Sequence, residues 1–217
     1  MIDLCSIREL EIEFTTLCNA RCPLCYRNYK SFKDSPYFLP RARGLAESIK
    51  QLESMPNLEF VMLVGSMSEP TLYFGLFDVI KHLKSRGVRI EICTNGDTHN
   101  VYWWRDLGKL LSLEDKVYFT ICGSTQELHE QYRAGTSLSH ILANAAALRS
   151  ILPVDYAQCI RFDYNSSNLD TAEFKKMVSQ FSHVYMTETF FPKDIDNYRA
   201  KFDISKFMPC KEKIKMY

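Results

Sequence analysis

The sequence predicts an α/β protein with a mostly parallel sheet that curves into an open, partial (β/α)6 barrel. Short runs rich in β-branched and aromatic residues alternate with longer amphipathic segments, which is the pattern of successive βαβ units. Six strand-like runs are present, too few for the eight strands of a closed barrel. At 217 residues the chain is long enough for an α/β barrel to form as a single unit.

The expected strands are the β-branched and aromatic runs at residues 11–14, 60–64, 89–93, 116–121, 158–164 and 183–187. The expected helices lie between them, at residues 44–54, 74–85, 102–111, 138–151 and 171–181. Leu45, Ile49 and Leu52 show the helical spacing of apolar residues that defines the first of these helices. Gly87, the pair at residues 95–96 and Gly123 mark turns at the ends of these elements.

Composition argues against several classes of protein. The formal net charge is +1, from 27 Lys and Arg against 26 Asp and Glu, so we expect no electrostatic binding of nucleic acid. We expect no membrane partner, because no apolar run approaches the length of a membrane span. Residues 1–6 lack both the basic start and the apolar stretch of a signal peptide. Eight cysteines without paired spacing suit a reducing compartment, so we expect a cytoplasmic protein.

Three cysteines carry the strongest functional signal. Cys18, Cys22 and Cys25 stand at spacings of four and three, in an expected loop after the first strand, and could converge on one metal centre. Cysteine thiolates are the usual ligands of iron–sulfur clusters, and a cubane has four irons to ligate. Three protein ligands therefore leave one iron open, and an open coordination position is where a metal site performs chemistry.

Two simpler interpretations of these cysteines compete with a cluster. A structural zinc site needs a fourth Cys or His with its own local partner, whereas His99 and His129 are isolated and no second C-x-x-C is present. A disulfide pair fits poorly with the absence of a signal-like N-terminus. A non-catalytic iron–sulfur or zinc module therefore stays open as an alternative to an enzyme.

The run Cys18-Asn19-Ala20-Arg21-Cys22-Pro23-Leu24-Cys25-Tyr26 resembles the cluster loop of the radical S-adenosylmethionine (SAM) superfamily, C-x3-C-x2-C. The resemblance implies a [4Fe-4S] cluster on the three cysteines, with the amino and carboxylate groups of SAM on the free iron. Reductive cleavage of SAM then yields a 5′-deoxyadenosyl radical. In this family Leu24 and Tyr26 would flank the adenine, and the fold would be the open (β/α)6 barrel.

Segments after the second and third strands continue the resemblance, at the carboxyl ends where parallel sheets bind ligands. Gly65-Ser66-Met67-Ser68-Glu69-Pro70 resembles the Gly-Gly-Glu-Pro motif that holds the amino group of SAM, although Ser66 replaces the second glycine and two residues precede Glu69. This implies SAM contacts from Glu69 or from the backbone of Gly65 and Ser66. Cys93-Thr94-Asn95-Gly96 resembles the Thr-Asn-Gly of relatives, which adds Thr94 and Asn95 to the expected cofactor contacts.

Residues 119–124, after the fourth strand, resemble the Ser-Ile-Asp-Gly of relatives, with Cys122 in the position of the aspartate and Ser124 as a neutral hydrogen-bond partner. Arg133 follows in a Tyr-Arg pair that relatives share; it would pair with the carboxylate of SAM, or else lie exposed on a helix. His129 is expected to be a structural histidine rather than a base. Asn165, at the end of the fifth strand, is an expected contact of adenosine or substrate.

The resemblance covers residues 7–187 and is closest to the subgroup that modifies peptides and proteins. Those relatives carry a cysteine-rich C-terminal extension (SPASM or twitch) with auxiliary clusters, whereas this chain has only Cys210 in its tail. We expect a radical SAM domain at residues 1–190 and a vestigial or truncated extension at residues 191–217. Cys210, which cannot ligate a cluster alone, is expected to be a vestige or to meet another chain. The remaining cysteines, Cys5, Cys93, Cys122 and Cys159, are expected to be small buried apolar residues.

The expected function is radical SAM catalysis, with hydrogen abstraction from a peptide or protein side chain. A radical SAM enzyme acting on a small metabolite or nucleotide is the alternative within the same family. A reductant such as a flavodoxin or ferredoxin is the implied partner.

Overall fold

The computed structural model describes residues 3–25, 27 and 41–188. Tyr26, Cys210 and the expected tail at residues 191–217 lie outside the described residues. The expected division into a domain and a tail therefore stays a prediction.

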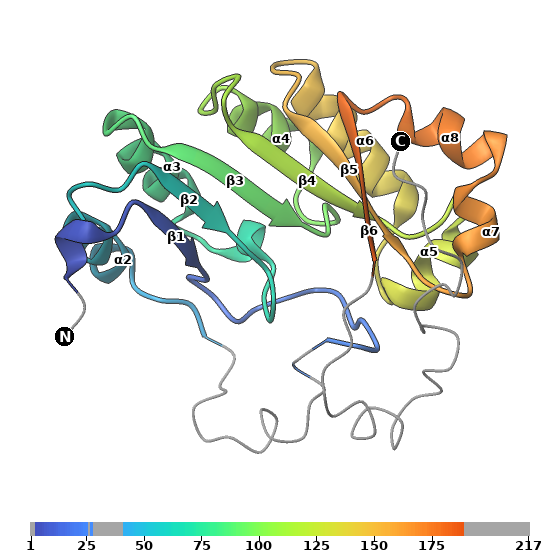
Figure 1. The fold of residues 1–217 in the computed structure, drawn as a ribbon, viewed down its shortest axis with the longest axis horizontal. Coiled ribbons are helices and arrows are strands. Elements are labelled where there is room, and N and C mark those ends of the chain that lie inside the picture. Colours follow the sequence, from blue (N-terminus) through green and yellow to red (C-terminus); the bar gives the residue numbers. More distant parts are fainter. Residues whose placement is uncertain (1–2, 26, 28–40, 189–217) are drawn as a thin grey trace.

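The described chain folds around one sheet of six parallel strands in the order β1-β2-β3-β4-β5-β6 (Figure 1). The strands are β1 (Glu9–Ile12), β2 (Phe60–Leu63), β3 (Arg89–Thr94), β4 (Lys116–Ile121), β5 (Asp155–Arg161) and β6 (His183–Glu188). Each strand pairs with the next along the chain, so every connection crosses over the same sheet. The predicted α/β class and the open, partial (β/α)6 barrel are confirmed.

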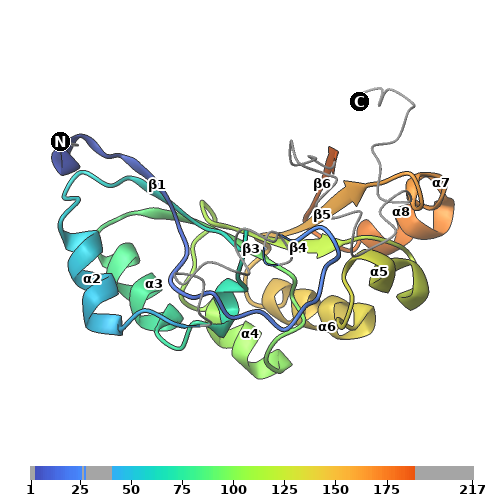
Figure 2. The same cartoon turned by 90° about the horizontal axis from the view of Figure 1, so that it is seen from below.

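Helices cover one face of this sheet. They are α2 (Leu45–Glu53), α3 (Leu76–Ser85), α4 (Val101–Gly108), α5 (Gln126–Tyr132), α6 (Leu138–Arg149), α7 (Ser166–Leu169) and α8 (Ala172–Val178). Short 3-10 helices form at η1 (Leu4–Ser6) and η3 (Pro70–Leu72). Figure 2 shows α2, α3, α4 and α6 together on one side of the strands. None of the described helices reaches the length and apolarity that crossing a membrane requires.

The core lies between the sheet and these helices. Alternate strand residues, such as Val61 and Leu63 of β2 and Ile90 and Ile92 of β3, point to the helices and are buried. Trp104 of α4 is fully buried in this layer, and its indole Nε1 donates to the carbonyl of Thr98 at 2.9 Å. The helical layer therefore fixes the curvature of the sheet from one side.

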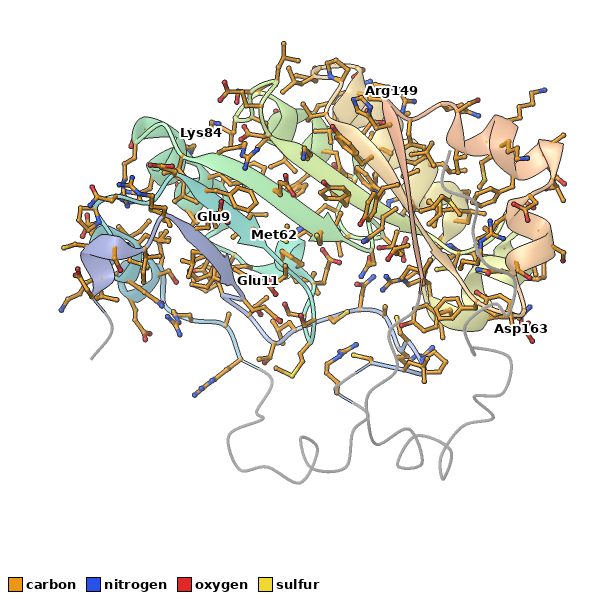
Figure 3. All side chains as sticks on the ribbon, viewed as in Figure 1. Glu9, Glu11, Met62, Lys84, Arg149 and Asp163 are labelled. Carbon is orange, nitrogen blue, oxygen red and sulfur yellow. The ribbon has the colours of Figure 1, made fainter. Side chains whose placement is uncertain are left out.

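The opposite face of the sheet is open in the described part of the chain, and it is polar. Figure 3 looks onto this face and shows Glu9, Glu11 and Met62 on it. Lys116 of β4 pairs with Glu91 of β3 across the face, with its Nζ 2.8 Å from Oε1. The strands thus alternate between an apolar face toward the helices and a mixed polar face toward solvent.

Two helices, α5 and α7, lie where no helix was expected. Among the expected strands the largest difference is at β5, which begins three residues earlier and ends three residues earlier than predicted. Asp155 opens the strand although it is an aspartate, because Arg149 and Ser182 donate to its buried carboxylate. The strand ends before Phe162 because the Phe162 N–H donates to the side-chain oxygen of Asn165 at 2.8 Å instead of to a neighbouring strand. β1 likewise ends before the predicted Phe14.

A second buried carboxylate joins neighbouring elements at the edge of the sheet where the strands begin. Asp115 accepts hydrogen bonds from the Lys84 ammonium, at 2.7 and 2.9 Å, and from the Ile90 N–H at 2.7 Å. Its side chain is shielded from water. A buried charge held in this way is costly to uncover, because the partners lose their compensation together.

Replacement of Asp115 by alanine tests this anchor. We expect Asp115→Ala to lower the free energy of unfolding by about 3–5 kcal/mol, because a partly buried ammonium and a buried backbone N–H lose their acceptor. The matched control is Asp106→Ala, which removes the pair with Lys109 on the surface, where the side chains are 55% and 62% exposed. That change should cost less than about 1 kcal/mol. Urea unfolding measures both, and equal losses would contradict the anchor.

Candidate functional site

The loop that carries the three cysteines follows β1 and crosses the edge at which the strands end (Figure 1). Residues 18–25 contain no helix or strand, so contacts with other segments position them. The Glu69 N–H donates to the carbonyl of Leu17 at 2.7 Å, and the Arg21 N–H donates to Ala134 at 2.8 Å. The Asn19 amide donates to the carbonyl of Asp97 at 3.0 Å. The loop is therefore tied to the segments after β2, β3 and α5.

Each of the three cysteine sulfurs has a nitrogen donor beside it. The Asn95 Nδ2 lies 3.9 Å from the Cys18 Sγ, and the Arg133 Nη1 lies 3.5 Å from the Cys22 Sγ. The third donor is Arg27, with Nε 3.4 Å from the sulfur of Cys25. Such donors stabilise thiolates, which are the form of cysteine that ligates metals.

Burial distinguishes the three thiols. Cys22 is buried, whereas Cys18 and Cys25 are half-buried. Burial raises the pKa of Cys18 to about 11, and the strongest opposing influence is the positive charge of Arg27. A thiol in such a site stays protonated unless a cation or a metal stabilises its thiolate.

The residues fit an iron–sulfur cluster by the chemistry of this donor set. Within residues 3–25, 27 and 41–188, no three His, Cys, Asp or Glu side chains are grouped to hold a metal ion. The expected convergence of the three thiols on one metal centre is therefore not confirmed. In a cubane, however, the thiolates ligate different irons, so a cluster does not require them to meet at one ion.

Glu69 is the most completely held of the predicted site residues. Its Oε1 accepts from the Thr71 N–H at 3.2 Å and from the hydroxyls of Thr71 and Thr94 at 2.7 and 2.6 Å. Its Oε2 accepts from the Asn95 N–H at 2.7 Å and is the oxygen with fewer hydrogen bonds among the described residues. The residue is only 1% exposed. Burial raises the pKa of Glu69 above its ordinary value, while the hydrogen bonds from Thr94, Asn95 and Thr71 oppose that rise.

The neighbouring turn requires a glycine and exposes its backbone. A Cβ on Gly65 would lie 2.3 Å from the carbonyl oxygen of Ser68, too close for any other residue. Gly65 and Ser66 are both exposed at the end of β2. The Glu13 carboxylate accepts from the Met67 N–H at 3.3 and 3.4 Å and holds the next residue of the turn.

Thr94 and Asn95 link the end of β3 to two other segments. The Thr94 hydroxyl donates to Glu69 and accepts from the Gly96 N–H at 2.9 Å. The Asn95 amide donates to the side-chain oxygen of Asn19 at 2.8 Å, next to Cys18. The structure thus brings Glu69, Thr94 and Asn95 together beside the cysteine loop.

Arg133 ends α5 and turns back toward the cysteines. Besides Nη1 beside Cys22, its guanidinium carbon lies 5.4 Å from the ring centre of Tyr132. Its Nε is buried and lacks a hydrogen-bond partner within the described part of the chain. The alternative of an exposed arginine on a helix is therefore wrong, because the helix end points this side chain inward.

His129 is a structural histidine, as predicted. It is fully buried, its Nδ1 lies 3.3 Å from the donating N–H nitrogen of Cys122, and its Nε2 lies 3.0 Å from the Thr136 hydroxyl oxygen. Burial, with a smaller contribution from the charge of Arg133, lowers the pKa of His129 to about 3. The neutral ring links the end of β4 to the segment after α5.

The other predicted contacts are placed around this centre. Leu24 is buried in the cysteine loop. Ser124 exchanges hydrogen bonds with the side chain of Asn168, at 2.8 and 2.9 Å. Asn165 is fully buried and donates to the carbonyls of Cys122 and Ile160 at 2.9 and 3.0 Å, so its amide joins the ends of β4 and β5. The cofactor contacts of all three residues stay predictions, as does that of Tyr26.

Two of the four cysteines expected to be buried differ from the prediction. Cys5 is exposed, because η1 at the start of the chain buries none of its residues. Cys93 is half-buried on the open face, and burial, with the neighbouring Glu91 and Glu11 carboxylates, raises the pKa of its thiol to about 12. Cys122 and Cys159 are buried as expected.

Arg27 is a residue that the sequence patterns did not single out. It stands two positions after Cys25, and a basic residue so close to a metal-ligating thiolate is a signal that could have identified it. Asn19 and Glu13 were also missed, because their partners are distant in sequence.

Comparisons with known proteins identify the family and the fold. The model of the radical SAM superfamily matches residues 12–162. A curated relative from Pyrococcus furiosus, the "tungsten-containing aldehyde ferredoxin oxidoreductase cofactor-modifying protein", is 27% identical over 143 residues, which are 65% of this chain and 36% of the relative.

Two solved structures share the fold. Streptococcus suis SuiB bound to the precursor peptide SuiA superposes with a TM-score of 0.66 at 14% identity, over 83% of this chain and 39% of SuiB. The structure of anSMEcpe with bound AdoMet (S-adenosylmethionine) gives a TM-score of 0.63 at 16% identity, over 85% of this chain and 50% of that chain.

The chain spans between a third and a half of the length of these relatives. The family match nevertheless includes the cysteine loop, Glu69, Asn95 and Arg133. It confirms the predicted family. By the match of its own residues 12–162, the chain belongs to the radical SAM superfamily.

Proposed function

We propose that this chain holds a [4Fe-4S] cluster on Cys18, Cys22 and Cys25 and uses it to cleave SAM reductively, so that the resulting 5′-deoxyadenosyl radical abstracts hydrogen from a peptide or protein side chain. The observation that carries the proposal is the cysteine loop, which brings three sulfurs, each beside a nitrogen donor, to the edge where the parallel strands end. This edge is the ligand-binding side of parallel α/β folds.

The residues around the loop supply complementary groups for the two ends of an amino acid. The Nε of Arg133, which has no hydrogen-bond partner among the described residues, is a donor for the carboxylate of SAM. The exposed backbone of Gly65 and Ser66, with the Oε2 of Glu69, offers acceptors for the ammonium. Leu24, Tyr26, Thr94, Asn95, Ser124 and Asn165 complete the proposed cofactor environment.

The open face of the sheet is the proposed substrate side. Cys93 lies half-buried on it, below the edge that carries the cysteine loop. SuiB, which shares the fold, binds a precursor peptide, and this supports a peptide or protein substrate. A flavodoxin or ferredoxin in a cytoplasmic setting is the proposed source of electrons.

A second candidate rests on the Pyrococcus furiosus relative. That protein is named as one that modifies a cofactor, which favours a small-molecule substrate for the same chemistry. The two candidate functions share the cluster and SAM and differ only in the substrate from which the radical abstracts hydrogen. Abortive SAM cleavage therefore tests the shared part, and transfer of deuterium from labelled peptide or small molecule into 5′-deoxyadenosine discriminates between them.

The first test concerns the cluster. Anaerobic reconstitution should give about four irons and four sulfides per chain, and Cys18→Ala, Cys22→Ala or Cys25→Ala should each abolish this loading, because each removes one of only three protein ligands. Iron and sulfide assays with Mössbauer spectroscopy measure it. Cys5→Ala and Cys210→Ala are the matched controls and should keep full loading. A cluster retained in the triple alanine variant would refute the ligand assignment.

The second test concerns Glu69. We expect Glu69→Ala to keep the iron content but to weaken SAM binding about tenfold or more. The reason is that four hydrogen-bond donors of the proposed cofactor site, from Thr71, Thr94 and Asn95, lose their acceptor. Glu69→Gln should have a smaller effect, since it still accepts from part of the set. Anaerobic equilibrium dialysis with labelled SAM measures the affinity.

The control for this test is Glu59→Gln, which alters a surface glutamate with a 64% exposed side chain. This variant should bind SAM like the unmodified protein. Unchanged SAM affinity in Glu69→Ala would mean that the segment from Gly65 to Pro70 does not contribute to the cofactor site.

A further inference from the structure

Arg27 folds back over the loop that precedes it and uses all three of its guanidinium nitrogens there. Its Nε lies 3.4 Å from the Cys25 sulfur, and its Nη1 donates to the carbonyl of Cys18 at 3.4 Å. Its Nη2 donates to the carbonyl of Ala20. One rigid, planar group therefore joins the first residue of the cysteine loop, its interior and its last residue.

These contacts matter because the loop has little structure of its own. Residues 18–25 form no helix or strand, and one internal backbone hydrogen bond, from the Cys25 N–H to Cys22, is seen among them. A loop with so few internal bonds needs side-chain ties to hold its ligands in one arrangement. The guanidinium also turns the carbonyl oxygens of Cys18 and Ala20 toward itself.

The other two nitrogen donors, Asn95 and Arg133, have contacts or proposed roles outside the cysteine segment. Asn95 also donates to Asn19, and the Nε of Arg133, which has no partner among the described residues, is the proposed donor to the carboxylate of SAM. Arg27 alone belongs to the segment that carries the cysteines, and its three nitrogens are committed to that segment. Among the contacts seen within the described part of the chain, those of Arg27 are thus confined to the cluster loop.

We propose that Arg27 is a positioning residue for the cluster: it holds the cysteine loop in its ligating form and, by donating to the Cys25 thiolate, raises the reduction potential of the cluster. This inference rests on the proposed function. A donor to a ligating sulfur favours the reduced, more negative cluster, and hydrogen bonds to cluster sulfurs are an established determinant of reduction potential.

The chain provides a matched control in Arg21. This arginine is on the same loop but is exposed, and its guanidinium lies beside Gly135, where a built Cβ would be 3.4 Å from the Arg21 Nε. Among the described residues, the hydrogen bond that Arg21 contributes to holding the loop comes from its backbone N–H. Arg21→Gln therefore removes the same charge from the same loop without removing a contact to a cysteine.

The experiment compares reconstituted unmodified protein with Arg27→Gln, Arg27→Lys and Arg21→Gln. A redox titration followed by electron paramagnetic resonance should show a more negative midpoint for Arg27→Gln, with about a tenfold lower ratio of reduced to oxidised cluster at a fixed potential, equivalent to about 59 mV for one electron. Iron release to a chelator should also be faster. Arg27→Lys keeps the positive charge but loses the planar guanidinium with its several donors. Its reduction potential should therefore lie nearer that of the unmodified protein, while its iron release should be as fast as that of Arg27→Gln.

The possible results distinguish failure of the inference about Arg27 from failure of the proposed function. If Arg27→Gln loads its cluster and matches Arg21→Gln in both potential and iron release, the inference is overturned while the proposed function stands. If Arg27→Gln does not fold, the iron release of Arg27→Lys takes its place, and a rate equal to that of Arg21→Gln overturns the inference. Absence of a cluster from the unmodified protein would instead refute the proposed function.

Discussion

The site depends on the buried carboxylate of Glu69. Its side chain accepts four hydrogen bonds, from Thr71, Thr94 and Asn95, and its backbone N–H holds the carbonyl of Leu17 just before the first cysteine. A buried carboxylate is tolerable only when donors replace the water that it has lost. The donors must therefore stay in place, and this fixes the positions of three segments that are far apart in sequence.

The environment of the cysteines follows from that constraint. Asn95 reaches the Cys18 sulfur because its own N–H is held by Glu69. Arg133 reaches Cys22 from the end of a helix whose His129 contacts Cys122 and Thr136. The donors beside Cys18 and Cys22 thus come from separate elements, and their arrangement exists only when the sheet edge is assembled.

The two faces of the sheet have different roles: one forms the core that stabilises the fold, and the other carries polar groups. The helical face is apolar, and ion pairs such as Lys84 with Asp115 close its far edge. The open face carries polar and ionisable groups such as Glu11, Glu91 and Cys93. Within residues 3–25, 27 and 41–188 the helices lie on one side only and leave this second face uncovered beside the cysteine loop, which suits a site that must admit both a cofactor and a substrate.

The sequence by itself determined the fold class and the cysteine motif, because both are local patterns. Alternating strand-like and amphipathic segments predict a parallel sheet wherever the strands pair, and the spacing of Cys18, Cys22 and Cys25 is visible without any partner. The boundaries of β5 were misjudged, since Asp155 enters a strand only when Arg149 neutralises it. Only the tertiary structure decided which donors meet the sulfurs of Cys18 and Cys22: Asn95 and Cys18 are 77 residues apart, and Arg133 and Cys22 are 111 apart. Contacts over such separations depend on how the sheet edge closes, which no local pattern encodes.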